Sequence, residues 1–367
     1  MIVVALILII MPISGCSESS QLHQKLIVQG IGIDVNDDNY KVTMQAYDYQ
    51  NPTSENEPTL KVVELTGKSI MEAFSSIYKQ TGLEPLYSQN MLIVLGEDVA
   101  KNGVSRVMDF FIRHYEVRPD VKICVARGNA YDIIKSETNE GYVKVKDISE
   151  LVYDKCDVVH FVGMIRDGVS SPSVTALKLQ NANNDKESKD GENKIVSDGI
   201  AYFREDKLVD FSDESQTKGI ELINGNCVGK TYVVDMGNNI KASCTVTGVS
   251  KEVKPVITDT NVDFNINIKV DAGVFEVAGR NMKLGTSISK YELERNLALH
   301  INDLSKQAVD KVVVKNGTDI FRFGKILMNT NPNYFRSLES WSDTLKKTNY
   351  NINTEVKISI SGTEIIF

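Results

Sequence analysis

The chain is short of the residues that metal and redox chemistry use. Its 367 residues include four histidines, and these lie far apart at His23, His114, His160 and His300. That spacing excludes a local metal cluster of histidine and cysteine. Five cysteines are too few for a disulfide scaffold of this length. The sequence therefore predicts no metal site and no cofactor.

Positive charge is also in deficit. The 41 Lys and Arg residues are outnumbered by 49 Asp and Glu residues, which gives a formal net charge of −8. A general nucleic-acid binder carries a basic surface, so nucleic acid is not an expected partner. Only 24 glycines and 8 prolines are present, which excludes a collagen-like chain. A hydrophobic content of 42% is enough for more than one core, so a multi-domain globular body is expected.

Long apolar runs are missing from the chain except at its start. Residues 1–16 carry no charged side chain. At about 1.5 Å per helical residue, fifteen residues reach roughly 22 Å, which is less than the ~30 Å hydrocarbon core of a bilayer. We therefore interpret residues 1–15 as a signal peptide that is removed from the mature protein.

The apolar run ends in the sequence Ile13-Ser14-Gly15-Cys16, which resembles a bacterial lipobox. In lipoproteins of this type the chain is cleaved before the cysteine, here after Gly15, and the sulfur carries a diacylglycerol. An N-acyl chain can then be added to the new terminus. Cys16 is thus the expected lipidation residue, and two acyl chains give lasting membrane attachment where one does not. Two alternatives remain open at this point, an uncleaved short anchor and a signal peptide without lipid.

The pattern of apolar residues predicts a mixed α+β fold of several domains, with mainly antiparallel sheets and packed helices. We expect residues 16–24 to be the lipidated terminus and a polar spacer. Residues 25–225 are expected to form an N-terminal α/β region, which could divide into two subdomains with a break near 128–195. Residues 226–367 predict a C-terminal domain of long strands and one long helix. A capping box of Ser289 and Glu292 begins that helix. Its expected buried face comprises Leu293, Leu297, Ile301, Leu304, Ala308 and Val312, and an antiparallel strand over 352–360 closes the chain.

Several motifs are similar to known binding loops but lack a residue or a spacing that those loops require. Residues 225–231 (Gly-Asn-Cys-Val-Gly-Lys-Thr) have three residues between the glycines, where a phosphate-binding loop needs four and a following helix. Residues 34–39 place oxygen atoms at calcium-loop spacing but have Asn39 where glycine is required, so a hairpin turn explains them better. No catalytic residue is predicted, although a triad dispersed along the chain remains open.

The cysteines of the body leave two interpretations open. Cys227 and Cys244 flank a predicted turn and could form a disulfide outside the cytoplasm. Buried free thiols are the alternative that we favour for Cys124, Cys156, Cys227 and Cys244.

A series of short motifs runs along the chain in a defined order. The series begins with the lipobox and Ile27-Val-Gln-Gly-Ile-Gly-Ile-Asp34, and continues with Leu92-Ile-Val-Leu-Gly-Glu97 and Gly103. In this order the motifs resemble the Ger(x)C family, the lipoprotein C subunits of bacterial spore nutrient germinant receptors. The remaining motifs are Asp109-Phe-Phe-Ile-Arg113, Asp198-Gly-Ile-Ala-Tyr-Phe203, Asp206-Lys-Leu-Val209, Asp319-Ile-Phe-Arg-Phe-Gly324, Asn331-Pro332 and Trp341.

The resemblance implies a function that composition and spacing do not. It implies a non-enzymatic, lipid-anchored subunit on the outer face of the spore inner membrane. Such a subunit acts with two integral membrane subunits in a receptor that triggers germination in response to nutrients. The alternative from another class is a solute-binding lipoprotein of a transporter, which would need two α/β lobes around a cleft.

Overall fold

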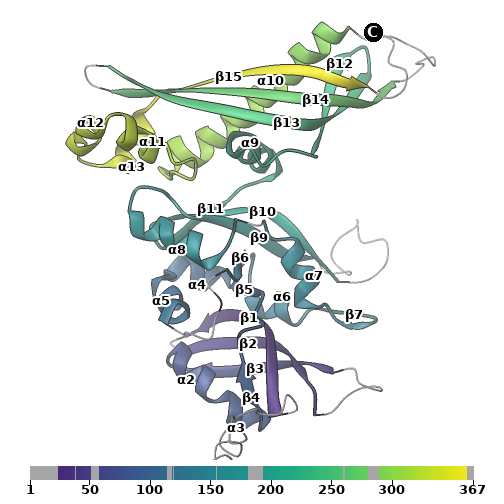
Figure 1. The fold of residues 1–367 in the computed structure, drawn as a ribbon, viewed down its shortest axis with the longest axis vertical. Helices are drawn as coiled ribbons and strands as arrows, with labels where there is room; N and C mark the ends of the chain where they lie inside the picture. The colour runs from purple at the N-terminus through teal and green to yellow at the C-terminus, as the bar shows by residue number, and fades with distance from the viewer. Residues whose placement is uncertain are drawn as a thin grey trace, which may run out of the picture.

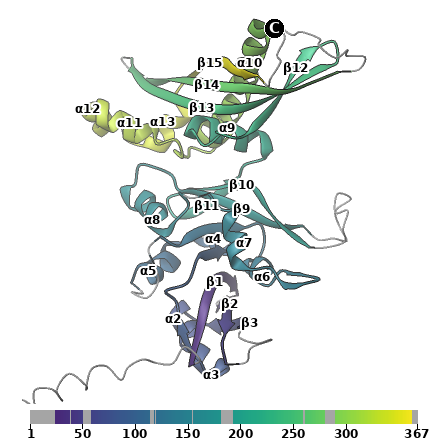
Figure 2. The ribbon, with the colours of Figure 1, turned by 45° about the vertical axis from the view of Figure 1, so that its right-hand side comes forward.

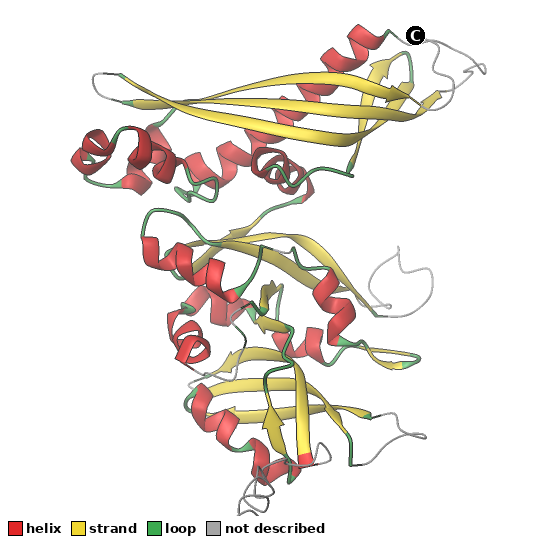
Figure 3. Ribbon diagram, in the orientation of Figure 1, coloured by secondary structure: helices red, strands yellow, loops and turns green. Residues whose placement is uncertain are grey.

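The computed structural model describes residues 24–37, 39–50, 58–113, 118, 120–153, 155–180, 193–258, 261–279 and 289–361. Two sheets are stacked along the long axis of the molecule, with helices around and between them (Figure 1). Coloured by secondary structure, the chain shows a larger sheet at one end and long strands at the other (Figure 3). The predicted mixed α+β, multi-domain fold is confirmed.

The first sheet has nine strands and is mixed in direction. Its centre is parallel, because β1 pairs with β5, β5 with β6, and β6 with β9 in the same direction. Antiparallel strands flank this centre on both sides. The path runs β11 (Lys207–Phe211), β10 (Lys194–Arg204), β9 (Ser173–Gln180), β6 (Lys122–Ala126), β5 (Leu92–Leu95), β1 (Lys25–Asn36), β2 (Asn39–Asp48) and β3 (Thr59–Gly67), and β4 (Glu84–Leu86) also pairs with β1.

Helices cover both faces of the first sheet (Figure 1). Glycines in β1 allow them to approach closely, since a Cβ at Gly30 would clash with Val145 and one at Gly32 would crowd Ala130. The helices are α2 (Ile70–Ser75), α3 (Ile77–Thr81), α4 (Glu97–Asn102), α5 (Ser105–Arg113), α6 (Ala130–Ile134), α7 (Val145–Glu150) and α8 (Val158–Asp167), with a small hairpin of β7 (Glu137–Thr138) and β8 (Gly141–Tyr142).

The second sheet has four strands and buries one face. Alternate residues of β13 and β14 are buried, as an antiparallel pair with one wet face requires. The buried face packs on α10 and on the π-helix that continues it, and all six residues of the predicted helix stripe are buried. The strands run in the order β12 (Thr231–Gly237), β13 (Ile240–Ile257), β14 (Val262–Gly279) and β15 (Tyr350–Ser361), and the helices are α10 (Lys290–Ala308), η3 (Val309–Lys315), α11 (Phe323–Thr330), α12 (Pro332–Ser337) and α13 (Trp341–Lys347).

One strand direction was predicted wrongly. The last strand, β15, pairs parallel to β14 and not antiparallel, with Phe264 opposite Tyr350 and Ala272 opposite Ile358. The helices between β14 and β15 carry the chain back to the starting end of β14, and such a crossover makes the two strands parallel. Alternation of Ile and Val along a strand does not depend on its direction, so the pattern could not distinguish the two cases.

Helix α9 (Glu214–Asn224) lies between the two sheets (Figures 1 and 2). Its residues Ile220, Leu222 and Ile223 belong to the core of the second sheet, as do Ile200 and Tyr202 of β10. The first sheet therefore shares side chains with the second core, and the contact between the two halves is a packed junction.

Candidate functional site

The predicted lipidation residue, Cys16, lies outside the described residues. The described body begins beside β1, where the amine of Lys25 is 2.6 Å from a carboxylate oxygen of Glu84 on β4. This end of β1 lies near α3, at the end of the molecule farthest from the second sheet (Figure 1). The chain thus enters the body at the pole opposite the second sheet. Across the described ranges, no helix combines the length and the apolar character needed to cross a bilayer.

The motif at residues 34–39 is a hairpin turn, as predicted. Asn36 pairs with Asn39, and Asp37 has a φ of 52° in the turn. The Asp34 carboxylate is buried and accepts hydrogen bonds of 2.8 Å from the backbone N–H groups of Ala130 and Tyr131. Burial raises the pKa of Asp34 above its ordinary value. Asp34 therefore joins β1 to the start of α6.

Residues 225–231 do not form a phosphate site. Gly225 ends α9 with a φ of 79°, and Thr231 begins β12. The glycine thus follows the carbonyl end of a helix, which carries a partial negative charge and repels phosphate.

Asp319 is the central polar residue of the junction between the two halves. Its side chain is 1% exposed and accepts hydrogen bonds from three N–H groups, those of the Phe323 backbone (2.8 Å), the Gly324 backbone (2.7 Å) and the Trp341 ring (3.0 Å). Burial raises the pKa of Asp319 to about 6, although these donors act in the opposite direction. The carboxylate holds α11 and α13 in fixed positions.

The backbone of Asp319 reaches across the junction. Its N–H donates to the Ser171 hydroxyl at 2.8 Å, and the Ser171 N–H donates to the Asp319 carbonyl at 3.0 Å. Ser171 lies in the loop between α8 and β9, which belongs to the first half of the chain. An ion pair of 2.7 Å between Lys325 and Asp167 joins the same two segments. The start of α11 is therefore fastened to the first sheet.

Gly324 permits the closest approach at this junction. A Cβ at this position would come within 2.6 Å of both Val169 and the Trp341 ring nitrogen. No larger residue fits without displacing one of them. The Trp341 ring also contacts Phe335, with centroids 5.6 Å apart, so the indole is packed on one edge and hydrogen-bonded on the other.

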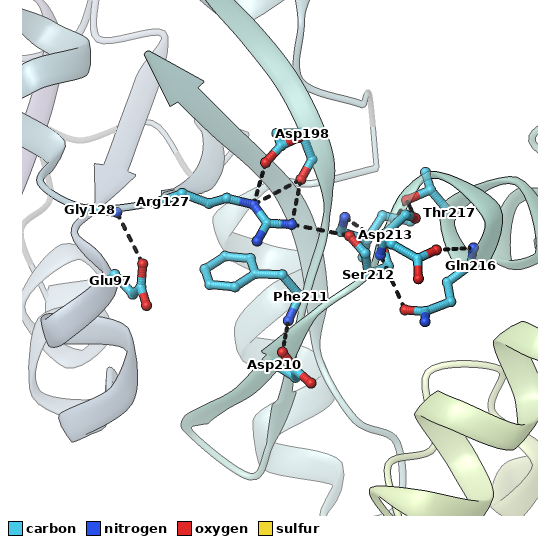
Figure 4. Close-up of polar contacts among 11 residues, drawn as sticks. Glu97, Arg127, Gly128, Asp198, Asp210, Phe211, Ser212, Asp213, Gln216 and Thr217 are labelled. Carbon is cyan, nitrogen blue, oxygen red and sulfur yellow. Dashed lines mark hydrogen bonds and ion pairs between the residues drawn. The ribbon is translucent and has the colours of Figure 1, made fainter. Parts of the chain in front are cut away.

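Arg127 fastens the other side of the junction (Figure 4). It follows β6, and its guanidinium donates to the backbone carbonyls of Asp198 (3.0 and 3.2 Å) and Ser212 (3.1 Å). It also forms an ion pair with the Asp198 carboxylate at 2.5 Å and lies 4.3 Å from the centroid of the Phe211 ring. Asp213 then caps α9 by accepting a hydrogen bond from the Gln216 N–H at 2.8 Å. Arg127 thus fixes the segment from which α9 begins.

Glu221 is a second buried acid at the junction. It is 3% exposed, accepts a hydrogen bond from the Tyr153 hydroxyl and forms an ion pair with Lys230. Burial and the neighbouring Glu221 carboxylate raise the pKa of Tyr153, so the hydroxyl stays protonated and donates. This contact joins the loop after α7 to α9 and to the segment before β12.

A cleft of about 360 Å³ opens beside these contacts. Its walls come from both halves, including Met164 and Ser173 from the first and Phe321 and Arg322 from the second. Pockets of this size at domain boundaries are common places for small ligands. The cleft is therefore one part of the junction that a small ligand could enter.

The described thiols are not suited to nucleophilic chemistry. Cys124, Cys156, Cys227 and Cys244 are free and buried, so of the two interpretations the free thiols are the observed one. Burial raises the pKa of Cys227 and of Cys244 to about 11 and also raises that of Cys124 and Cys156. A reactive cysteine requires the opposite shift. Within the described ranges, no three His, Cys, Asp or Glu residues are grouped so that they could hold a metal ion.

Some of the sequence motifs lie in contact in the tertiary structure. The backbone N–H of Ser105, two residues after Gly103, donates to the Asp206 carboxylate at 3.2 Å. Asp198 pairs with Arg127, which lies outside the motifs. Asp319, Gly324 and Trp341 form one cluster. Sequence analysis did not single out Arg127, Glu221 or Lys251. For Arg127 a signal exists, because an arginine directly after the buried apolar run 123–126 needs a partner.

Both halves of the chain match families of known proteins. Residues 18–157 match the family described as "Spore germination protein N-terminal domain", and residues 198–362 match "Spore germination B3/ GerAC like, C-terminal". Spore germination protein B3 of Bacillus subtilis (strain 168) is 26% identical, over 96% of each chain. Spore germination protein KC of the same strain is 21% identical, over 93% of this chain and 90% of the relative. The crystal structure of the GerBC protein shares the fold, with a TM-score of 0.58, 22% identity and coverage of 90% of this chain and 97% of that one.

Proposed function

This chain belongs to the Ger(x)C family of spore germination proteins, and we propose that it is the lipid-anchored, non-enzymatic subunit of a spore germinant receptor. In this role it acts with two integral membrane subunits and is required for nutrient-triggered germination. The observation that carries the proposal is the match to spore germination proteins along nearly the whole chain.

The proposed anchor is a diacylglycerol thioether on Cys16, after cleavage at Gly15, with an N-acyl chain such as palmitate on the new terminus. The support is the lipobox sequence, because no helix in the described part of the chain could take the place of the lipid. Lipid at Cys16 places the lipoprotein on the outer face of the spore inner membrane. Tethering raises its local concentration near the membrane subunits, so weak contacts suffice for assembly.

The geometry of the described body supports a defined orientation on the membrane. Eight residues separate Cys16 from Lys25, and the nine steps between the two Cα atoms allow a reach of at most ~32 Å. The pole that carries β4 and α3 therefore lies nearest the lipid. Met71 and Tyr78 are 57% and 62% exposed on the helices of this pole, and tyrosine favours the membrane interface. In this orientation the second sheet projects away from the membrane.

The buried acids of the fold support a binding role over turnover. Asp34, Asp319 and Glu221 are each committed to backbone or side-chain partners within the fold. A general acid or base must be free to exchange a proton with a substrate. These three buried carboxylates thus connect helices and strands within the fold.

The transporter alternative fits the fold less well. A solute-binding lipoprotein needs two α/β lobes that close on a ligand. Here the second sheet buries one face on α10 and η3, and alternate residues of β14 on the other face stay in contact with water. The second half of this chain is therefore not an α/β lobe, because helices cover only one face of its sheet.

The test is a Cys16→Ala variant in the spore former that carries the protein. We expect unlipidated protein, loss from the membrane fraction and loss of germination with the cognate nutrient, while other nutrients still work. Ser17→Ala is the matched control, because it leaves the modified cysteine in place. A Cys16→Ala protein fused to an unrelated membrane-spanning helix should regain function if tethering is the role of the lipid.

Two results would reject the proposal. The first is normal germination by spores whose Cys16→Ala protein is soluble and unmodified by mass spectrometry. The second is turnover of a nutrient by the purified wild-type protein, which would replace the non-enzymatic role with a catalytic one.

A further inference from the structure

The cleft at the junction brings together three cations from separate parts of the chain. Lys155 follows α7, Lys251 lies on β13 and Arg322 directly precedes α11, and all three line the same cavity of about 360 Å³. None of these three side chains makes an ion pair or side-chain hydrogen bond with any residue that the structure describes. Like charges that line one cavity without an acid paired to any of them repel one another.

Acids near the cleft are already engaged. Glu221 lines the cavity, but its carboxylate is paired with Lys230 and accepts from Tyr153. Glu252, the neighbour of Lys251 on β13, pairs with Lys254 at 2.7 Å. Partial burial lowers the pKa of Lys251, and the charges of Arg322 and Lys155 lower it further.

Arg322 is held in a backbone conformation that is unfavourable for arginine. Its φ of 63° lies in the left-handed region, which glycine adopts far more readily. Strained residues of this kind concentrate at ligand sites. The same turn sets the positions of Phe321 and Phe323, which are both buried.

The remaining walls of the cleft are apolar with a few hydrogen-bonding groups. Val174, Ile200, Ile220 and Phe321 are buried side chains that line the cavity, and Asn224 contributes a carboxamide. An anion in this space would meet three positive charges and also hydrocarbon walls. An inorganic anion would pair with the positive charges but would gain nothing from the hydrocarbon walls.

We propose that this cleft is a binding site for a small organic carboxylate with a compact apolar body. The carboxylate pairs with Lys251, Arg322 and Lys155, and the apolar part packs on the isoleucines and Phe321. Because the site is built from both halves of the chain, the bound ligand joins them and stabilises the junction. The inference does not depend on lipid attachment or on the role in germination.

The experiment uses the full-length protein in non-ionic detergent and 4-fluorobenzoate as the probe, followed by ¹⁹F NMR. We expect saturable binding at one site and a rise in the thermal unfolding midpoint. Lys251→Met and Arg322→Gly should each weaken binding about tenfold or more, as the loss of a charge-assisted contact predicts. Lys241→Met on the same strand, outside the cleft, is the matched control and should leave the affinity unchanged.

Arg322→Gly also separates binding from folding. Glycine suits the left-handed backbone, so this variant should fold at least as stably as the wild type while it binds less. Two further probes test the charge and the apolar body of the ligand separately. The probe 4-fluorobenzamide lacks the charge, and inorganic phosphate lacks the apolar body. Both should bind more weakly than 4-fluorobenzoate.

Three outcomes would overturn the site. The first is that 4-fluorobenzoate does not bind saturably. The second is that Lys251→Met and Arg322→Gly bind it as tightly as the wild type does. The third is that phosphate binds as tightly as 4-fluorobenzoate. None of them bears on the germination defect of Cys16→Ala, so failure of this inference and failure of the proposed function are distinguishable.

Discussion

Asp319 and Ser171 lie 148 residues apart in the sequence and exchange hydrogen bonds across the junction of the two halves. The Asp319 N–H donates to the Ser171 hydroxyl, and the Ser171 N–H donates to the Asp319 carbonyl. At the same time the Asp319 carboxylate accepts from the start of α11 and from Trp341. One residue thus joins the first sheet, α11 and α13, and its environment can be tested directly.

The indole N–H of Trp341 should stabilise the charged form of Asp319. Trp341→Phe removes this donor, and we expect the free energy of unfolding at pH 7 to fall by about 1–3 kcal/mol. This loss of stability should be smaller near pH 5, where Asp319 is protonated. A neutral carboxyl group accepts a weaker hydrogen bond from the indole than a carboxylate does. Urea unfolding followed by circular dichroism at both pH values measures it.

Phe335→Leu is the control for Trp341→Phe. It reduces packing against the indole ring without touching Asp319, so its cost should be the same at both pH values. An equal cost of Trp341→Phe at pH 7 and pH 5 would contradict the assigned role of the indole N–H.

Asp319 should make the protein more stable as the pH falls from about 6 to about 4. Burial holds its pKa at about 6, above the ordinary 3.8, so the folded state binds this proton more tightly than the unfolded chain. Stability from this group therefore rises on acidification, by at most about 3 kcal/mol. It is lost again as the pH rises through 6.

Comparison with Asp319→Asn isolates this effect from the other carboxylates. Asp120, Asp167 and Asp210 have lowered pKa values and act in the opposite direction in both proteins. The stability of the wild type relative to Asp319→Asn should increase as the pH falls. Fluorescence of Trp341, the one tryptophan of the chain, reports unfolding at this junction. A constant difference between the two proteins would refute the raised pKa.

Gly324→Ala should destabilise the protein by about 1–3 kcal/mol, because overpacking forces neighbouring groups to move. The added Cβ would meet Val169 and the Trp341 ring. Gly163→Ala is the matched control on α8, where nothing lies within 4 Å of an added Cβ. That change should stabilise the helix by up to about 1 kcal/mol. Thermal unfolding measures both, and equal midpoints for the two variants would contradict the close approach at Gly324.

Arg127→Lys should loosen the segment that leads into α9. A lysine keeps the charge but cannot donate to the carbonyls of Asp198 and Ser212 from one planar group. We expect a loss of about 1–3 kcal/mol and faster amide hydrogen exchange over residues 212–217. Arg166→Lys, at an exposed position on α8, should have little effect. Unchanged exchange in Arg127→Lys would show that another contact holds α9.

Local periodicity was sufficient to predict much of the secondary structure. The hairpin of β1 and β2 and the buried stripe of α10 follow from repeats of 2 and 3.6 residues, and both are observed. The Ser289 hydroxyl accepts a hydrogen bond from the Glu292 N–H, as the first member of a capping box does. These features depend only on neighbours within a few positions.

The partners of the charged residues could not be predicted in the same way. The sequence around Asp34 is similar to a calcium loop. In the structure, its carboxylate accepts a hydrogen bond from the start of α6, 96 residues further along the chain. A turn sequence gives no information about which distant backbone will cover it. Arg127 and Glu221 were missed for the same reason.

The sequence by itself determined the element types, the mixed α+β class, the family resemblance and the candidate lipid-bearing residue, Cys16. Only the tertiary structure decided the direction of β15, the partners of Asp319 and Arg127, and the convergence of Lys155, Lys251 and Arg322 on one cleft. The physical reason is the distance along the chain over which each kind of interaction acts. Side-chain periodicity is set by backbone geometry over a few residues, whereas the burial and pairing of a charge depend on segments that meet only when the whole chain has closed.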